Sequence, residues 1–449
     1  MNESKARTAF FRWRDGAGLE TFSALFGALL GLSLLKFGNP VVMEKFVTGP
    51  QGLYDWLISP WPLPIGYWLL LPVAVIGLLV ARWEMTAPGW LLSLPLIWLG
   101  WQFVSATRTI DSQLTRATLV QFGSCVTCFY LGYFSLGRVK NHRPFWLGLL
   151  GALAVVLASG FQQHFGGLAE SRRYFFAYVY PQLKTVPVEY LKRVSDNRIF
   201  STLFYPNTLA EVLLLLTPPL LIVLWRAGVR WNAPARKTVV GLAGVACLAC
   251  LYWSGSKGGW LFMLVIGTVA LLRLPFQRQL NMGLVIIVLT MGTAGFALKY
   301  AGYFRKGATS VSARFDCWRA VGQIVETHPW VGTGPGTFGV IYQQIKRSES
   351  EMARMAHNDY LEQASNSGLP GFVAYVAFIV GTLTWAGRQL VIVRDAGLFA
   401  IWLGLLGWSL HELLEFGLYI PAIGWTAFGL LGWLLKLPGN QFDSGVGES

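Results

Sequence analysis

Charged residues, and acidic ones above all, are scarce in this sequence. Only 13% of its 449 residues are charged, and 22 Asp and Glu stand against 36 Lys and Arg, which gives a formal net charge of +14. Hydrophobic residues make up 54% of the chain, and the mean hydropathy is +0.49. A soluble protein of this length needs a more polar surface, so the composition excludes that class and indicates membrane-spanning helices.

Cysteine is scarce as well, with five in the whole chain. Cys125 and Cys128 form one C-x-x-C pair and Cys247 and Cys250 another, but both pairs lie within apolar runs. A tetrahedral metal site normally has more ligands nearby. We therefore expect these cysteines to pack as small apolar side chains between helices. Cys317 stands alone in a polar segment, without an obvious disulfide partner there.

Long apolar runs are what the sequence has in abundance. A span needs about 20 mostly apolar residues to cross roughly 30 Å of hydrocarbon, and no soluble domain or internal repeat interrupts the pattern. These runs predict an all-α polytopic membrane protein with about twelve transmembrane helices, in which residues 1–449 form a single integral membrane domain. The predicted spans lie near 19–38, 66–82, 88–104, 117–136, 144–162, 205–225, 238–253, 258–272, 283–299, 368–386, 396–412 and 420–437.

Basic residues set the orientation, because short cytoplasmic loops are enriched in Lys and Arg. With both termini in the cytoplasm, the inner segments hold 17 of the 36 basic residues and the short outer segments hold 5. The other 14 lie in or directly beside two long outer loops, about 163–204 and 300–367. Anchoring in the membrane explains the inner basic residues. For the basic residues of the outer loops, binding of an anionic ligand is a second explanation.

The two long outer loops differ in composition. Loop 163–204 interleaves basic and aromatic residues, as nucleic-acid-binding proteins also do. It is predicted to face away from the cytoplasm, so we expect no nucleic acid and favour lipid headgroups, phosphates or sugars. Loop 300–367 predicts a partly helical cap: an amphipathic helix over 310–326, a glycine turn at 332–336, and a second polar helix over 341–356.

Four side chains are predicted to meet on the outer side of the membrane: Arg198, Lys257, Arg314 and His357. Arg and Lys bind phosphate through charge-assisted hydrogen bonds. Such groups suit a pyrophosphate leaving group, which gains negative charge as a glycosidic bond breaks. A histidine titrates near neutral pH and can accept a proton from an attacking hydroxyl. Asn358 and Asp359, beside His357, are placed to orient the ring or the acceptor.

Each of these residues also has an ordinary explanation. A lone loop histidine is often only solvated, and basic side chains near a span commonly extend to lipid headgroups. Arg314 could form a salt bridge within its own helix. A second candidate polar network lies near the outer end of the eleventh span, where ionisable residues at membrane level are functional suspects: His411, Glu412 and Glu415.

Four motifs occur in order along the chain. The first is the segment 198–207, an Arg-led entry to a span that ends in Asn207, and the second is the turn 254–259 around Lys257. The third joins Arg314-x-x-x-Trp318 to Pro329 and the glycine turn, and the last is His357-Asn358-x-x-Leu361 followed by glycines at 368 and 371. Together they resemble the O-antigen ligase family, although family members often carry Arg where Lys257 stands. The wider superfamily includes O-antigen polymerases and bacterial protein O-oligosaccharyltransferases.

The resemblance implies a glycosyltransferase of GT-C-like helical character. It would move a glycan from undecaprenyl diphosphate to a sugar hydroxyl of lipid A–core, inverting the anomeric centre, without a metal or other cofactor. His357 would be the base, and Arg198, Lys257 and Arg314 would hold the diphosphate. The supporting residues would be Asn207, Asn358 and Asp359. The resemblance places such an enzyme in the Gram-negative inner membrane with its active site on the periplasmic side, among membrane lipids.

Three alternatives stay open. A polymerase would use a second lipid-linked glycan as acceptor, and a protein O-oligosaccharyltransferase would use Ser or Thr hydroxyls. A transporter or flippase for an anionic lipid belongs to a different class. It would favour charged groups inside the spans and paired broken helices, whereas here the basic groups gather at one face.

Overall fold

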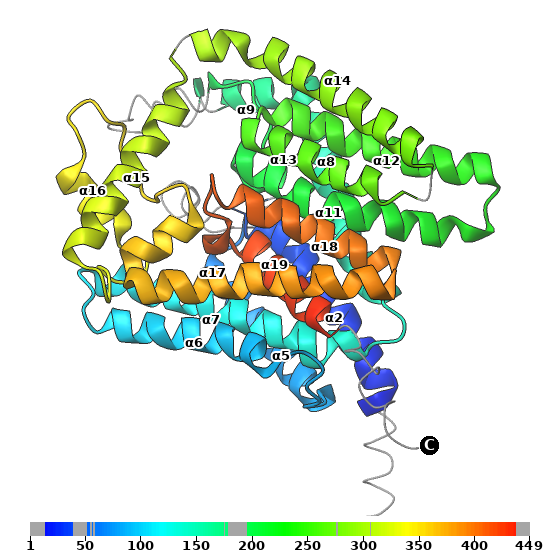
Figure 1. The fold of residues 1–449 in the computed structure, drawn as a ribbon, viewed down its shortest axis with the longest axis horizontal. Coiled ribbons are helices and arrows are strands. Elements are labelled where there is room, and N and C mark those ends of the chain that lie inside the picture. The colour runs from blue at the N-terminus through cyan, green and yellow to red at the C-terminus, as the bar shows by residue number, and fades with distance from the viewer. Residues whose placement is uncertain are drawn as a thin grey trace, which may run out of the picture.

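The computed structural model describes residues 14–38, 52–53, 56, 59–174, 176–177, 195–274, 277–305 and 307–436. Every regular element within these ranges is helical (Figure 1). Nine helices there are long and apolar enough to cross a membrane: α2 (Ala17–Lys36), α5 (Leu63–Val80), α6 (Gly89–Ala106), α7 (Ser112–Phe134), α8 (Arg143–Gln162), α11 (Pro206–Ala227), α12 (Ala233–Ser254), α14 (Arg278–Arg305) and α17 (Asp359–Val393). Three apolar helices are shorter: α13 (Lys257–Leu272), α18 (Ala396–His411) and α19 (Pro421–Leu435).

Each of the twelve predicted spans falls on one of these helices, in agreement with a polytopic all-α membrane protein. The three short helices have 15 or 16 residues, fewer than the about 20 that a span needs, so a count of twelve spans stays a prediction. Both predicted outer loops lose residues to helices. Loop 163–204 begins with a π-helical segment, η2 (Gln163–Gly167), followed by α9 (Leu168–Tyr174), while its residues 178–194 lie outside the described ranges. Loop 300–367 ends early because α17 begins at Asp359.

Two helices, α15 (Thr309–Thr327) and α16 (Phe338–Ile345), lie together at one end of the bundle, on the left of Figure 1. The turn between them bonds to α17 where Gly368 (φ +71°) interrupts that helix. Gly334 N donates to Asn366 O at 2.9 Å, and Leu369 N donates to Pro329 O at 2.8 Å. These bonds satisfy backbone groups that the interruption frees, and they fasten α15 and α16 to the bundle.

The second polar helix of this region is shorter than its predicted range of 341–356. It ends at Ile345, and the chain then turns through a serine-rich segment. The Ser348 hydroxyl bonds to Glu349 at 2.9 Å, and the Ser350 hydroxyl to Asp316 of α15 at 2.7 Å. Short polar side chains that find such local partners compete with helix formation.

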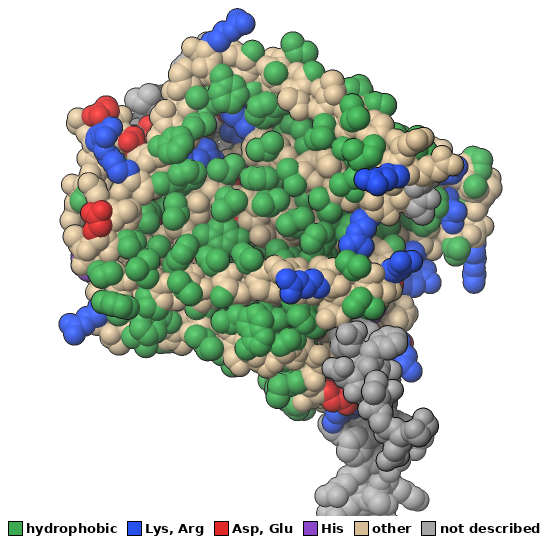
Figure 2. Space-filling view, in the orientation of Figure 1, with side chains coloured by type: hydrophobic (Ala, Val, Ile, Leu, Met, Phe, Trp, Pro, Cys, Tyr) green, Lys and Arg blue, Asp and Glu red, His purple; other side chains and the backbone are tan. Residues whose placement is uncertain are grey.

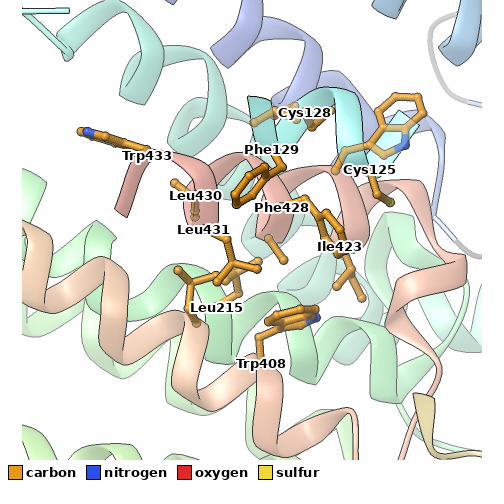
Figure 3. Packing of buried hydrophobic residues seen from close by; sticks show 14 of the residues in the cluster. Cys125, Cys128, Phe129, Leu215, Trp408, Ile423, Phe428, Leu430, Leu431 and Trp433 are labelled. Atoms are coloured by element: carbon orange, nitrogen blue, oxygen red, sulfur yellow. The ribbon is translucent and has the colours of Figure 1, made fainter. Parts of the chain in front are cut away.

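The centre of the bundle is α19, in which every residue is buried. Figure 3 shows Phe428 of α19 with Cys125 and Phe129 of α7 above it, and Leu215 of α11 and Trp408 of α18 below. All five cysteines are buried and unpaired, which confirms that they pack as small apolar side chains. A helix buried on every face positions its neighbours, so α7, α11 and α18 have fixed ends on which a site can be built.

Glycines allow α2 and α8 to cross closely. A Cβ added at Gly148 of α8 would meet the backbone of Gly27 and Ala28, and one added at Gly31 would meet the backbone of Gly148. Without an aqueous hydrophobic effect between them, helices in a membrane associate by such close packing of small residues. In contrast, a Cβ at Gly151, one turn further along α8, would meet no atom within 4 Å.

We predict that Gly148→Leu destabilises the protein by about 1–3 kcal/mol, because the new side chain must force two backbones apart. Thermal unfolding of the purified protein in detergent would measure the effect. Gly151→Leu is the matched control and should leave the unfolding temperature close to that of the wild type. Equal unfolding temperatures for the two variants would contradict the close crossing of α2 and α8.

Candidate active site

His357 lies directly before α17. Its backbone has φ +52°, in the left-handed region that residues other than Gly rarely occupy. The next residue, Asn358, caps α17 by accepting a hydrogen bond from Leu361 N at 3.0 Å. The His357 side chain is 26% exposed, and its ring packs edge-on against Phe416. The local fold therefore presents a partly accessible imidazole at the start of a capped helix.

A buried carboxylate, Glu415, faces this ring from the segment between α18 and α19. Its Oε2 lies 3.6 Å from His357 Nδ1, and its Oε1 accepts hydrogen bonds from Arg314 Nη2 and Asn207 Nδ2, each at 2.5 Å. Burial alone would raise the pKa of Glu415, but its interactions with Arg314 and His357 outweigh burial and lower the pKa to about 2. Glu415 therefore stays ionised at neutral pH and connects three of the predicted site residues.

Arg314 fastens α15 to the segment that carries Glu415. Its Nε donates to Leu414 O at 3.0 Å and its Nη1 to Ser310 O at 3.1 Å, in addition to the bond from Nη2 to Glu415. Burial would lower the pKa of Arg314, but Glu415 raises it overall. A guanidinium has five N–H donors, so these three bonds leave two for a ligand. The alternative of a salt bridge within its own helix is therefore wrong: Arg314 pairs with Glu415, a carboxylate far along the chain.

Arg198 joins the same network through Asn207, which lies in the first turn of α11. Arg198 Nη2 donates to Asn207 Oδ1 at 2.7 Å, and Asn207 Nδ2 in turn donates to Glu415. Arg198 Nε donates to Ser254 O, at the end of α12, at 2.7 Å. Arg198, which is predicted to bind the diphosphate, is therefore linked to the predicted base His357 by a continuous series of polar contacts.

Lys257 is the first residue of α13, directly after the turn that Arg198 contacts. Its Nζ lies 3.7 Å from the centre of the Tyr303 ring and 5.2 Å from that of Tyr300, in cation–π contact with both. Gly255 in this turn has φ +63°, and a Cβ there would come 3.1 Å from Arg198 Nε. Figure 2 shows Lys and Arg side chains set back among hydrophobic ones between α14 and α15.

The side chains of Asn358 and Asp359 do not face the His357 ring; they bond to the backbone of neighbouring segments. The Asn358 side chain is used as the helix cap. Asp359 is fully buried; its N–H donates to Glu412 O at 2.9 Å, and its Oδ2 accepts from Leu418 N at 2.8 Å. Both bonds hold the segment 412–418, which carries Glu415. The carboxylate that the structure sets against His357 is thus Glu415.

Nothing in the sequence singles out Glu415 as the centre of the site. The sequence does indicate a polar network among His411, Glu412 and Glu415, and that group divides in two. His411 pairs with Glu211 of α11, with 3.5 Å between Nδ1 and Oε2, whereas Glu415 turns to Arg314 and His357. The useful signal was an acidic residue at membrane level, because a buried carboxylate requires positively charged partners.

Comparison with known proteins bears on the same region. Residues 242–376 match the family model described as O-antigen ligase, and this stretch contains Lys257, Arg314 and His357. That part of the chain is similar to the O-antigen ligase family. The family description supports a function of the O-antigen ligase or polymerase type. Arg198, Asn207 and Glu415 lie outside the matched residues and join the site only through the fold.

A protein of Haemophilus influenzae, described as an uncharacterized protein, is also similar to this chain. The two are 26% identical over a segment that covers 28% of this chain and 38% of that protein. The match therefore spans about two fifths of the relative's length. It adds no activity to the one implied by the O-antigen ligase family.

We predict that Glu415→Gln reduces the free energy of unfolding at neutral pH, by on the order of 3 kcal/mol for a carboxyl pKa lowered from 4.5 to about 2. Because the folded pKa lies below the unfolded one, the contribution of Glu415 is complete above about pH 5 and is lost as the pH falls towards 2. Unfolding measured from pH 7 to pH 3 should show the gap between wild type and variant narrowing.

The matched control for this measurement is Glu326→Gln, at an exposed position on α15. It should follow the wild type at every pH. A gap for Glu415→Gln that stays constant with pH would show that the stabilisation does not come from the ionised carboxylate.

Proposed function

We propose that the protein is an O-antigen ligase, an inverting and metal-independent glycosyltransferase in lipopolysaccharide biosynthesis. It moves a glycan from undecaprenyl diphosphate to a sugar hydroxyl of lipid A–core. The observation that carries the proposal is the network in which Glu415 joins the imidazole of His357 to Arg314 and, through Asn207, to Arg198. This network brings an imidazole and two guanidinium groups to one end of the bundle, which supports a proton acceptor beside groups able to bind phosphate.

In the proposed reaction, His357 Nε2 takes the proton of the acceptor hydroxyl as its oxygen attacks the anomeric carbon of the donor. At 3.6 Å the Glu415 carboxylate is too far from Nδ1 for a hydrogen bond. Its negative charge nevertheless favours a proton on Nδ1, leaves Nε2 free to act as the base, and stabilises the imidazolium that forms. Glu415 is therefore a positioning residue and His357 the catalytic base.

As the new bond forms, the bond between the anomeric carbon and the diphosphate oxygen breaks, and its electron pair leaves with the diphosphate. Attack opposite the leaving group inverts the anomeric centre. Arg198 and Arg314 keep unused N–H donors, and Lys257 adds a third positive charge. These groups stabilise the negative charge that grows on the leaving group, in the role that a divalent metal has in other glycosyltransferases.

The proposed setting is the Gram-negative inner membrane, with both termini cytoplasmic and the site periplasmic. Support comes from the twelve predicted spans falling on helices and from the basic residues that gather in the predicted inner segments. The site combines the starts of α11, α13 and α17 with Arg314 of α15 and the segment after α18. The clustering of its cations at one end of the bundle favours a reaction at one face over transport across the membrane.

Acceptor specificity is the direct test. Purified protein supplied with an undecaprenyl-diphosphate glycan should form product with lipid A–core, and excess EDTA should not reduce the rate. A peptide acceptor should give no product, nor should donor alone. Polymer from donor alone would identify a polymerase and a glycopeptide a protein transferase, while activity that EDTA removes and a divalent cation restores would contradict the metal-independent mechanism.

We predict that His357→Ala abolishes glycan transfer, with a loss of about 100-fold or more expected when a general base is removed, while donor binding persists. Transfer and binding would be measured separately on the same preparation. His328→Ala is the matched control, because His328 is exposed at the end of α15 and its side chain bonds only to the neighbouring Thr327 among the described residues. Substantial residual transfer by His357→Ala would remove His357 from the role of base.

A further inference from the structure

A second lysine, Lys299, lies beside the turn that carries Lys257. It comes from the last third of α14, and its Nζ lies 3.3 Å from the centre of the Tyr252 ring and donates a hydrogen bond to Tyr252 O. Arg198 reaches the same turn by its bond to Ser254 O. The positive charges of Arg198, Lys257 and Lys299 thus lie at a single turn, residues 252–257.

These three charges lack the neutralising partner that Arg314 has. Arg314 is paired with Glu415, but among the described residues no carboxylate lies within 4.0 Å of Arg198, Lys257 or Lys299. Asp196 attracts Lys257 from a greater distance. Like charges held together repel one another, and a bound polyanion would relieve that repulsion.

Tyrosine rings position the two lysines without neutralising them. The Lys257 ammonium lies over Tyr303 and the Lys299 ammonium over Tyr252, while Tyr300 lies within 5.5 Å of both. An ammonium has three N–H donors. Lys299 uses one on Tyr252 O, and no hydrogen bond joins Lys257 Nζ to a described residue. The remaining donors are available to phosphate oxygens.

The helix that carries Lys299 is suited to a lipid rather than to a soluble anion. Its neighbour Leu298 is 84% exposed and Met291, two turns earlier, is 70% exposed, and α14 as a whole is apolar and little buried. Placing an ionisable residue on such a helix costs free energy, so its presence indicates a function. A ligand with an anionic head and a long apolar tail would satisfy both Lys299 and the exposed surface of α14.

We propose that Lys299 is a further phosphate-binding residue and that Lys257 and Lys299 each bind one phosphate of a polyprenyl diphosphate, whose apolar chain lies along α14. This inference rests on the proposed function and divides its site in two. Glu415 and His357 serve the acceptor and its proton, while Arg314, paired with Glu415, adds its unused donors to the leaving group. Lys257, Lys299 and Arg198 bind the leaving group and distinguish a lipid diphosphate from a lipid monophosphate.

The test compares binding of undecaprenyl diphosphate and undecaprenyl monophosphate to the protein in nanodiscs, without acceptor. Wild type should prefer the diphosphate. Lys299→Ala should weaken diphosphate binding roughly tenfold or more, as loss of a charge-assisted bond does, with little change for the monophosphate. Lys299→Arg should restore most of the preference. Arg305→Ala, which removes an exposed cation from the same helix, should resemble wild type.

Lys299→Met, which keeps the length of the side chain, serves as a second variant if Lys299→Ala unfolds. Unchanged diphosphate binding in these variants would overturn the assignment of Lys299, and equal losses for both lipids would overturn the division of one phosphate to each lysine. If wild type transfers glycan and the lysine variants bind normally, the further inference alone fails. If wild type binds the diphosphate through Lys299 but transfers no glycan, the proposed function alone fails.

Discussion

The arrangement of the site depends on one buried negative charge. Glu415 is 4% exposed, and a carboxylate in such a place is stable only with positive and hydrogen-bonding partners. Its partners come from α11, from α15 and from the residue before α17, which are far apart in the sequence. The need to neutralise this charge therefore draws three elements to the same end of the bundle and fixes where His357 stands.

The remaining positive charges have the opposite character. Arg314 is held by Glu415, whereas Lys257 and Lys299 rest on tyrosine rings without an ion-pair partner among the described residues. The charge of Arg314 is thus neutralised within the protein, whereas the charges of Lys257 and Lys299 are not neutralised by any described residue. These two sides of the site match the two needs of the proposed reaction: a base held in a fixed position, and positive charges that bind an anion.

Much of the fold follows from the sequence, because a membrane obliges apolar segments to satisfy their backbone groups as helices. The same topology brought Arg198, Lys257, Arg314 and His357 to one end. Contacts between distant segments could not be predicted: Glu415 is separated from His357 by all of α17 and α18, and nothing local pairs them. In the sequence, Lys299 looks like an ordinary charge at the end of a span. The predicted span 368–386 begins at Gly368, whereas α17 begins at Asp359, because Gly368 interrupts that helix without ending it.

The short helices have a consequence for water. With 15 or 16 residues, α13, α18 and α19 extend only about 23 Å, less than the roughly 30 Å of a hydrocarbon layer. The groups at their ends lie below the protein surface: His411 and Glu415 are buried, and Lys257 is partly buried. In the proposed reaction, a donor seated at that depth meets a sugar alcohol more readily than bulk solvent, which protects the activated glycan from wasteful hydrolysis.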